Sequence, residues 1–455
     1  MNCLTGETDR LINNDVFLST APSATEIRFR QARNGSSILG TIFLIVNTTL
    51  GAGLLDFPQA FDKAGGIVAS VLIQLVFLVF ITAALIILAN CSDFTNTSTV
   101  QNTFAGLCGP RSLLLCAICV VLYSFGCCLT FLIIIGDQFD RVFVTYYGID
   151  YCHTWYLSRQ FITTVTSCIF ILPMCFFKRL DALSYASSIG CITILYVAWL
   201  ISYKSLTKTT TVAVRIWPEN VYEALNIVPI ICFAYQSHMT AIPMYACMKE
   251  RHLGKFTLCA VISMIICFII YTAVGIFGYE TFGIGKVPSD ILQGYSDKSV
   301  LVTIAIISFA LKNFTTYPIV LYCGRDAVLA ILGKDVDLSV KTRNFVTSIW
   351  FVASLVLAIL LPDISSVINL LGAISAMFIF ILPGICLFQS ILIKDPELYL
   401  NKDRLLIVLA ITITALGAFV CGLVLIETIQ DLKKPPAALP LVTGFRKGLG
   451  ANLCV

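Results

Sequence analysis

Residues 38–61 read ILGTIFLIVNTTLGAGLLDFPQAF, an apolar run interrupted in its middle by polar residues and two glycines. Glycine is a poor helix former, and Asn and Thr side chains compete for backbone hydrogen bonds. Non-helical backbone at membrane depth occurs only where it is buried in protein or lines a water-filled cavity. The stretch therefore predicts two half-helices with a break at Leu50 to Gly53. The alternative is an unbroken helix whose glycines allow close packing on a neighbour.

The composition predicts an all-α polytopic membrane protein. The chain has 455 residues, of which 58% are hydrophobic and 12% charged, whereas soluble proteins carry about 25% charged residues. The net charge of +4 gives no indication of nucleic-acid binding. The 19 cysteines lie mostly in apolar runs and only three histidines occur, so we expect no metal cluster and no cofactor. No nucleotide-binding loop or catalytic constellation is evident, and we do not expect an enzyme.

A membrane-spanning helix needs about 20 apolar residues. The sequence predicts eleven such spans, at residues 38–61, 66–89, 112–136, 159–177, 182–203, 222–247, 256–279, 299–323, 344–362, 364–388 and 405–429. Lys and Arg are more frequent in the loops on one side of this map, and the positive-inside rule then places the N-terminus in the cytosol. We predict a cytosolic arm (1–37), a membrane domain (38–429) and a disordered tail (430–455).

The sixth span carries a second interruption. Residues 235–240 read YQSHMT between Pro229 and Pro243, which is too polar for a lipid-facing helix. Two interrupted spans in corresponding places of two five-span halves (38–203 and 222–388) indicate an inverted-repeat secondary transporter and mark its binding site. The alternative is that Pro243 only kinks the helix and that the polar residues bond to neighbouring helices.

Several motifs resemble those of the sodium-coupled neutral amino acid transporters, which belong to the amino acid/auxin permease group. They are NTTLGAGLLDFP (47–58), AGG (64–66), IGDQ (135–138), IICFAYQSH (230–238), YP (317–318) and FIFILPGIC (378–386). The chain is most similar to the glutamine-preferring branch, which includes the lysosomal glutamine and asparagine exporter. The resemblance implies a LeuT-type fold of five plus five spans with an eleventh added. It also implies transport of neutral L-amino acids, coupled to sodium or protons, by alternating access.

The two breaks supply complementary partners for an amino acid. A carboxylate suits the N–H groups at a helix N-terminus, which here belong to Gly51, Ala52 and Gly53. An ammonium suits carbonyls at the end of a half-helix, which here belong to Phe233, Ala234 and Tyr235. Three polar residues either meet the substrate side chain or order the second break, namely Gln236, Ser237 and His238. Tyr123 is a candidate aromatic gate or an ordinary packing residue.

The resemblance also implies a sodium site between the first and eighth spans. Its predicted ligands are Asn47, Leu50, Thr315 and Thr316. The alternative for the two threonines is a hydrogen bond from each hydroxyl to its own helix, which is common in membrane spans.

Asp56 and Lys312 depart from the family pattern. A charge inside the membrane is costly and requires a partner. Three interpretations of Lys312 remain open at this stage. Its ammonium stands in for the sodium ion, or it pairs with Asp56 as an outer gate, or it extends to the membrane surface without a role in coupling.

The N-terminal arm contains ETDRLI at residues 7–12, which resembles an acidic dileucine sorting signal that cytosolic adaptors read. This motif favours a lysosomal location, with the plasma membrane as the alternative. A different function would also fit the same fold, namely an amino acid sensor with little turnover whose cytosolic arm binds signalling partners.

Overall fold

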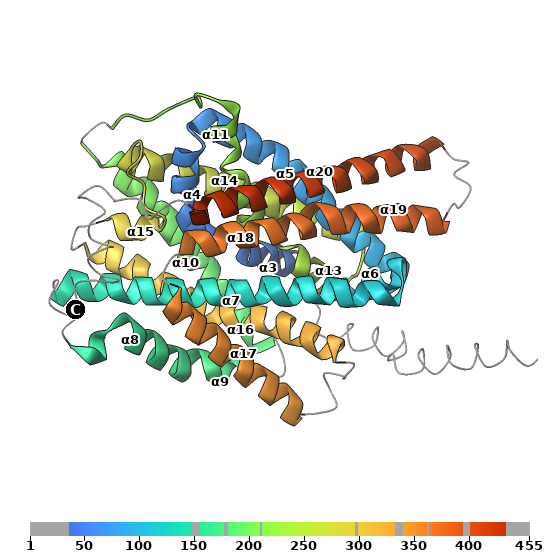
Figure 1. Ribbon diagram of the computed structural model, residues 1–455, viewed down its shortest axis with the longest axis horizontal. Coiled ribbons are helices and arrows are strands. Elements are labelled where there is room, and N and C mark those ends of the chain that lie inside the picture. Colours follow the sequence, from blue (N-terminus) through green and yellow to red (C-terminus); the bar gives the residue numbers. More distant parts are fainter. Residues whose placement is uncertain are drawn as a thin grey trace, which may run out of the picture.

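In the computed structural model, the regular secondary structure of the described residues is helical, apart from an isolated backbone bridge between Ser36 and Met248. The described residues are 36–147, 154–176, 181–209, 212–295, 299–332, 340–361, 364–394 and 401–433. The predicted sorting motif, most of the predicted arm and the tail beyond 433 lie outside them. Most helices run roughly along the long axis of the molecule (Figure 1).

The first half of the chain contains the first predicted break. Its elements are α3 (Ile38–Thr49), α4 (Gly53–Lys63), α5 (Ile67–Thr95), α6 (Val100–Cys108), α7 (Pro110–Tyr147), a 3-10 turn (Trp155–Leu157), α8 (Arg159–Thr166), a π-helical turn (Ser167–Ile171), α9 (Leu172–Cys175) and α10 (Asp181–Leu206). The axes of α3 and α4 are bent by 56° relative to each other.

The second half contains the second predicted break. Its elements are α11 (Val221–Leu225), α12 (Val228–Ala234), α13 (His238–Ala246), α14 (Leu253–Phe282), α15 (Ile291–Gly294), α16 (Val300–Ile331), α17 (Val340–Leu360), α18 (Ile364–Ala376), a π-helical turn (Met377–Ile381), α19 (Leu382–Lys394) and α20 (Asn401–Lys433). The last helix continues past residue 429, the predicted end of the membrane domain.

The length and apolar character of the helices indicate an integral multi-pass membrane protein. Within the described residues, eight helical stretches are long and apolar enough to cross a membrane, and the bent pair α3–α4 makes a ninth. Two of the predicted spans, 159–177 and 182–203, correspond to the shorter apolar helices Arg159–Cys175 and Gly190–Leu206. The predicted count of eleven spans therefore stays a prediction.

The interrupted helices are packed inside the molecule. α14 packs against both α3 and α4, and α12 packs against α4 and α18, while α7 and α16 form a long pair beside them. Among these helices, Leu54, Phe57 and Phe61 of α4 and all residues from Val228 to Ala234 are buried. The two breaks are thus surrounded by protein rather than by lipid.

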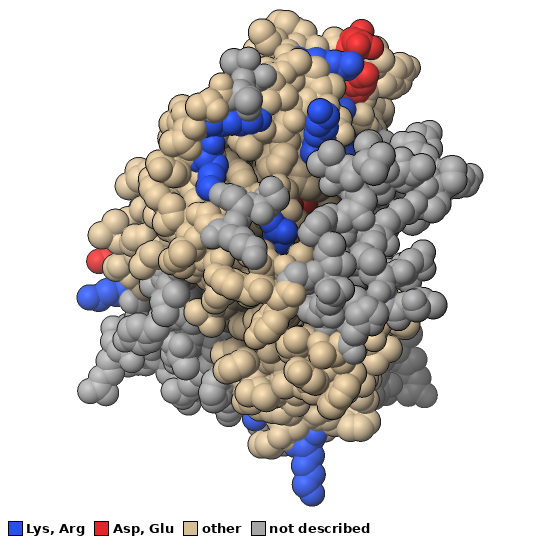
Figure 2. All heavy atoms as spheres, turned by 90° about the vertical axis from the view of Figure 1, so that its left-hand side faces the viewer, with Lys and Arg blue, Asp and Glu red and all other residues tan. Residues whose placement is uncertain are grey.

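Polar contacts join the helices at the two ends of the bundle. At one end, the Arg251 guanidinium donates a hydrogen bond to the Asp93 carboxylate of α5 at 2.9 Å. At the opposite end, Arg159 of α8 pairs with Asp137 of α7 at 3.1 Å. Figure 2 views this second end and shows most of its Lys and Arg side chains between the centre and the top of the view.

Glycines allow α14 to approach α4 closely. A Cβ atom on Gly278 would lie 2.4 Å from the Pro58 Cγ atom, and one on Gly275 would lie 2.7 Å from the Phe61 ring. Both partners are buried and lie in the helix that follows the first break, so this contact helps to fix the position of that helix.

We predict that Gly278→Ala lowers the free energy of unfolding by about 1–3 kcal/mol, because overpacking a close contact forces the backbone or Pro58 to shift. Gly422→Ala in α20 is the matched control, since no atom of the described chain lies within 4 Å of its added Cβ. Thermal unfolding of both variants in detergent checks this. Equal melting temperatures for the two would contradict the close packing of α14 on α4.

Candidate functional site

The first break exposes backbone groups at the start of α4. α3 ends at Thr49, Leu50 has non-helical dihedral angles, and α4 begins at Gly53. No side chain caps the N-terminus of α4. Within the described chain, the N–H groups of Gly51 and Ala52 have no backbone acceptor. These groups are the ones that the sequence predicts for a carboxylate.

The second break is a short turn of Tyr235 to Ser237 between α12 and α13. The Gln236 side-chain oxygen accepts a hydrogen bond from the His238 backbone N–H at 2.9 Å and lies 3.1 Å from the His238 Nδ1 atom. The His238 Nε2 atom lies 3.2 Å from the Ile81 carbonyl of α5. Both ring nitrogens therefore face oxygen acceptors of the protein, and the N–H of a neutral imidazole donates to one of them. Of the two predicted roles for His238, this geometry favours ordering of the break.

The two breaks touch each other at Gly53. A Cβ atom on Gly53 would lie 2.7 Å from the Ala234 Cβ and 3.5 Å from the Phe233 ring. Gly51 differs, since an added Cβ would meet only the Thr49 carbonyl oxygen, at 3.9 Å. Gly53 is thus required for close approach, while the space beside Gly51 is open. The predicted carboxylate and ammonium partners lie on adjoining segments.

Two helices that the sequence analysis did not single out hold the breaks in place. The Tyr271 hydroxyl of α14 bonds to the carbonyls of Thr49 at 2.7 Å and Ala234 at 3.0 Å. The Gln74 amide of α5 donates to the Tyr235 hydroxyl at 2.6 Å. The sequence offered one usable signal for these residues, namely a polar Gln74 inside an otherwise apolar predicted span.

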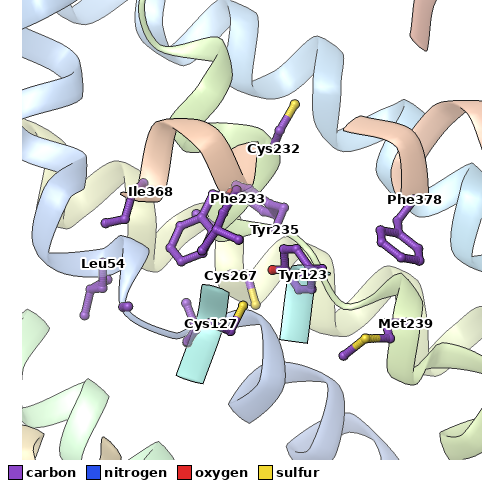
Figure 3. Packing of buried hydrophobic residues seen from close by; sticks show 14 of the residues in the cluster. Leu54, Tyr123, Cys127, Cys232, Phe233, Tyr235, Met239, Cys267, Ile368 and Phe378 are labelled. Atoms are coloured by element: carbon purple, nitrogen blue, oxygen red, sulfur yellow. The ribbon is translucent and has the colours of Figure 1, made fainter. Parts of the chain in front are cut away.

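Tyr123 lies in a buried apolar cluster that surrounds the second break (Figure 3). Its ring centroid is 5.9 Å from that of Phe378, in the π-helical turn between α18 and α19. The neighbouring Ser124 hydroxyl lies 3.4 Å from the Met239 sulfur of α13. Tyr123 therefore comes from α7 to the side of the site formed by α13 and the π-helical turn, where its role as a gate remains a prediction.

The predicted ion site contains the ammonium of Lys312. This group donates a hydrogen bond to the Leu50 carbonyl at 2.8 Å, and the side chain is only 2% exposed. It therefore does not extend to the membrane surface. Asn47 and the aliphatic part of Lys312 both face Gly190 of α10, because a Cβ atom on Gly190 would lie 2.6 Å from the Asn47 Oδ1 atom and 3.4 Å from the Lys312 Cγ atom. Glycine at 190 allows α10 to close over both side chains.

The two predicted threonine ligands lie in the same region of α16. The hydroxyls of Thr315 and Thr316 donate to the Lys312 backbone carbonyl at 2.8 Å and 2.9 Å. This is the hydrogen bond to the helix's own backbone that was the alternative to ion binding, although each hydroxyl oxygen retains lone pairs that can bind an ion.

Asp56 is buried in the first turn of α4.

Several buried polar atoms around the breaks have no hydrogen-bond partner within the described chain. They are Asn47 Oδ1, Gln236 Nε2, Ser237 Oγ and both side-chain polar atoms of Asn313. Leaving a buried polar group unpaired costs about 1–3 kcal/mol. The site thus combines open backbone groups with polar side chains that lack partners, which suits reversible binding of a small polar molecule.

We predict that Gly53→Ala lowers the melting temperature, because its methyl group would push α4 away from Ala234 at a cost of about 1–3 kcal/mol. Gly51→Ala is the matched control two residues away, and its methyl group enters open space. We expect its melting temperature to stay within about 2 °C of the unsubstituted protein. Thermal unfolding by intrinsic fluorescence measures both. A larger loss for Gly51→Ala would contradict the described contact of the two breaks.

Comparison with known proteins identifies the family. The family model of the transmembrane amino acid transporter proteins matches residues 34–430. A sodium-coupled neutral amino acid transporter 7 of Danio rerio is 35% identical over 405 residues, which cover 86% of this chain and 87% of that protein. Its Homo sapiens counterpart is 34% identical over 86% of this chain and 87% of its own length. A putative sodium-coupled neutral amino acid transporter 8 of Xenopus tropicalis is 34% identical over 85% of this chain and 91% of its own length.

A solved structure shares the fold. The crystal structure of MhsT in complex with L-phenylalanine matches with a TM-score of 0.53 at 16% identity, covering 87% of this chain and all of that one. At this identity the likeness concerns the fold alone. The sequence relatives decide the family, and they agree with the resemblance seen in the motifs. The chain belongs to the transmembrane amino acid transporter family and is a membrane transporter rather than an enzyme.

Proposed function

We propose that this protein is a secondary active transporter of neutral L-amino acids, with glutamine and asparagine as the preferred class. The observation that carries the proposal is the contact of the two helix breaks at Gly53 and Ala234. That contact places helix N-terminal N–H groups beside C-terminal carbonyls, which are the partners of a zwitterion. The relatives named as neutral amino acid transporters support the same class.

The side-chain preference rests on the second break. The amide nitrogen of Gln236 and the hydroxyl of Ser237 are buried and lack a partner within the described residues. A substrate with a terminal amide offers both a donor and an acceptor to such groups, whereas an aliphatic side chain leaves them unpaired. Glutamine and asparagine are therefore better matched to this break than leucine.

The packing of the helices supports a transport cycle of the LeuT type. We propose the LeuT-type arrangement of five plus five spans with α20 as the eleventh, and alternating access by movement of the interrupted spans and their partners against α7 and α16. No covalent step is involved. The driving force is the ion gradient and the membrane potential, the latter worth about 2.3 kcal/mol per charge per 100 mV.

Different observations support two ways of coupling transport to an ion gradient. The names of the relatives favour sodium, with Asn47, Leu50, Thr315 and Thr316 as ligands. The hydrogen bond from Lys312 to the Leu50 carbonyl favours a second mode, in which the ammonium supplies the positive charge that a sodium ion would bring. In that mode transport is independent of sodium and responds to pH.

The proposal is tested by uptake of radiolabelled glutamine into proteoliposomes that contain the purified protein. Sodium outside is compared with choline, each with and without an inward proton gradient. Saturable uptake driven by one of the ions supports the proposal and selects the coupling mode, and competition by asparagine but not by leucine supports the substrate class. Absence of uptake of any amino acid under both gradients would contradict transport and favour the sensor function.

We predict that Lys312→Met abolishes the pH dependence of uptake if Lys312 replaces the ion, because the substitution removes the buried charge and its donor to Leu50. Lys312→Arg keeps the charge but does not release its proton in the measured pH range, so it should also lose the pH dependence. Lys255→Met is the control, since that lysine lies in an exposed pair with Glu250. Uptake by each variant is measured across a series of pH values. An unchanged pH profile in Lys312→Met would rule out the second mode.

A further inference from the structure

The Tyr271 hydroxyl lies between the two helix breaks. It is within 2.7 Å of the Thr49 carbonyl and 3.0 Å of the Ala234 carbonyl, and the side chain is fully buried. Thr49 is the last residue of α3 and Ala234 is the last residue of α12. One side chain of α14 therefore connects the ends of the half-helices that precede both breaks.

The Tyr271 hydroxyl does not offer enough donors for the two carbonyls that it contacts. A tyrosine hydroxyl has a single hydrogen to donate, whereas both of its partners here are carbonyl acceptors. The carbonyls at a helix C-terminus lack intrahelical partners and carry the negative end of the helix dipole. One hydroxyl hydrogen shared between two such carbonyls satisfies neither fully.

An α-ammonium group is a better partner for the same two carbonyls. It has three N–H donors and a full positive charge, and charge-assisted hydrogen bonds are roughly twice as strong as neutral ones. The ammonium and the Tyr271 hydroxyl would need the same acceptors. The backbone of Gly51, where the substrate carboxylate is expected, also interacts with this hydroxyl. The hydroxyl thus occupies the junction of both expected substrate partners.

We propose that the Tyr271 hydroxyl is a placeholder for the substrate ammonium. In the empty carrier it caps the carbonyls of Thr49 and Ala234, and the incoming ammonium displaces it. This inference rests on the proposed transport function and assigns a specific step to Tyr271. The step is the return of the empty carrier, during which both breaks are closed off from water and no substrate is present to satisfy these carbonyls.

The proposed role of Tyr271 affects net uptake and exchange differently. In exchange, the carrier returns loaded, and the ammonium caps the carbonyls in both directions. In net uptake, the carrier must return empty, and the carbonyls then depend on Tyr271. Removing the hydroxyl leaves buried acceptors without a donor during the empty return only, so it slows net uptake and leaves exchange unaffected.

The test compares Tyr271→Phe with the unsubstituted protein in proteoliposomes, under one ion gradient. Net uptake of labelled glutamine is measured into vesicles without amino acid, and exchange into vesicles preloaded with unlabelled glutamine. Phenylalanine keeps the ring that stacks on Phe57 at a centroid distance of 4.4 Å. Tyr279→Phe is the matched control in the same helix, because its hydroxyl contacts the Arg215 backbone rather than either break.

We expect Tyr271→Phe to lower net uptake about tenfold while exchange stays within about twofold, which corresponds to the loss of one buried hydrogen bond in the empty return. Tyr279→Phe should leave the ratio of the two fluxes unchanged. A parallel fall of net uptake and exchange, or no change in either, would overturn the assignment of Tyr271. If the unsubstituted protein shows neither flux, the proposed transport function itself fails.

Discussion

The structure depends on satisfying the backbone groups of two helices that stop inside a membrane protein. Lipid offers no hydrogen bonds, so each N–H and C=O group released at Thr49, Gly53 and Ala234 must find a partner in protein, solvent or ligand. The chain meets this need in part by bringing the breaks into direct contact and by bonding Tyr271 to both. Within the described chain the N–H groups of Gly51 and Ala52 have no backbone acceptor, and these groups mark where a ligand is expected.

Further polar contacts link the helices that surround the two breaks. Tyr235 of the second break is bonded to Gln74 of α5, which in turn accepts from Thr272 of α14. Near one end of the bundle, Arg251 joins the segment after α13 to Asp93 of α5. These contacts connect α5, α13 and α14 to one another. A group of helices joined in this way is suited to move as a unit, whereas α7 and α16 each make their largest contact with the other.

The sequence predicted where the helix breaks and the buried Lys312 lie, but not which residues they contact. The glycines and polar residues at 51–53 and 235–238 locate the interruptions, because their chemistry is local and unsuited to a lipid-facing helix. The partner of Lys312 is not local, since Leu50 is 262 positions away, and nothing in the pattern of α16 distinguishes Leu50 from Asp56 as its partner. Tyr271 was missed because a tyrosine in an apolar helix looks like ordinary packing until the opposite helix ends are known.

The buried polar groups near Lys312 need partners that the described chain does not supply. The Lys312 ammonium donates to the Leu50 carbonyl, and within the described chain Asn47 Oδ1 and both side-chain polar atoms of Asn313 have no hydrogen-bond partner. Each unpaired group costs about 1–3 kcal/mol, and apolar residues of similar volume would remove that cost. In the transport cycle proposed above, water, an ion or substrate would supply the missing partners. A ligand that does so better in one state than in another shifts the equilibrium between those states.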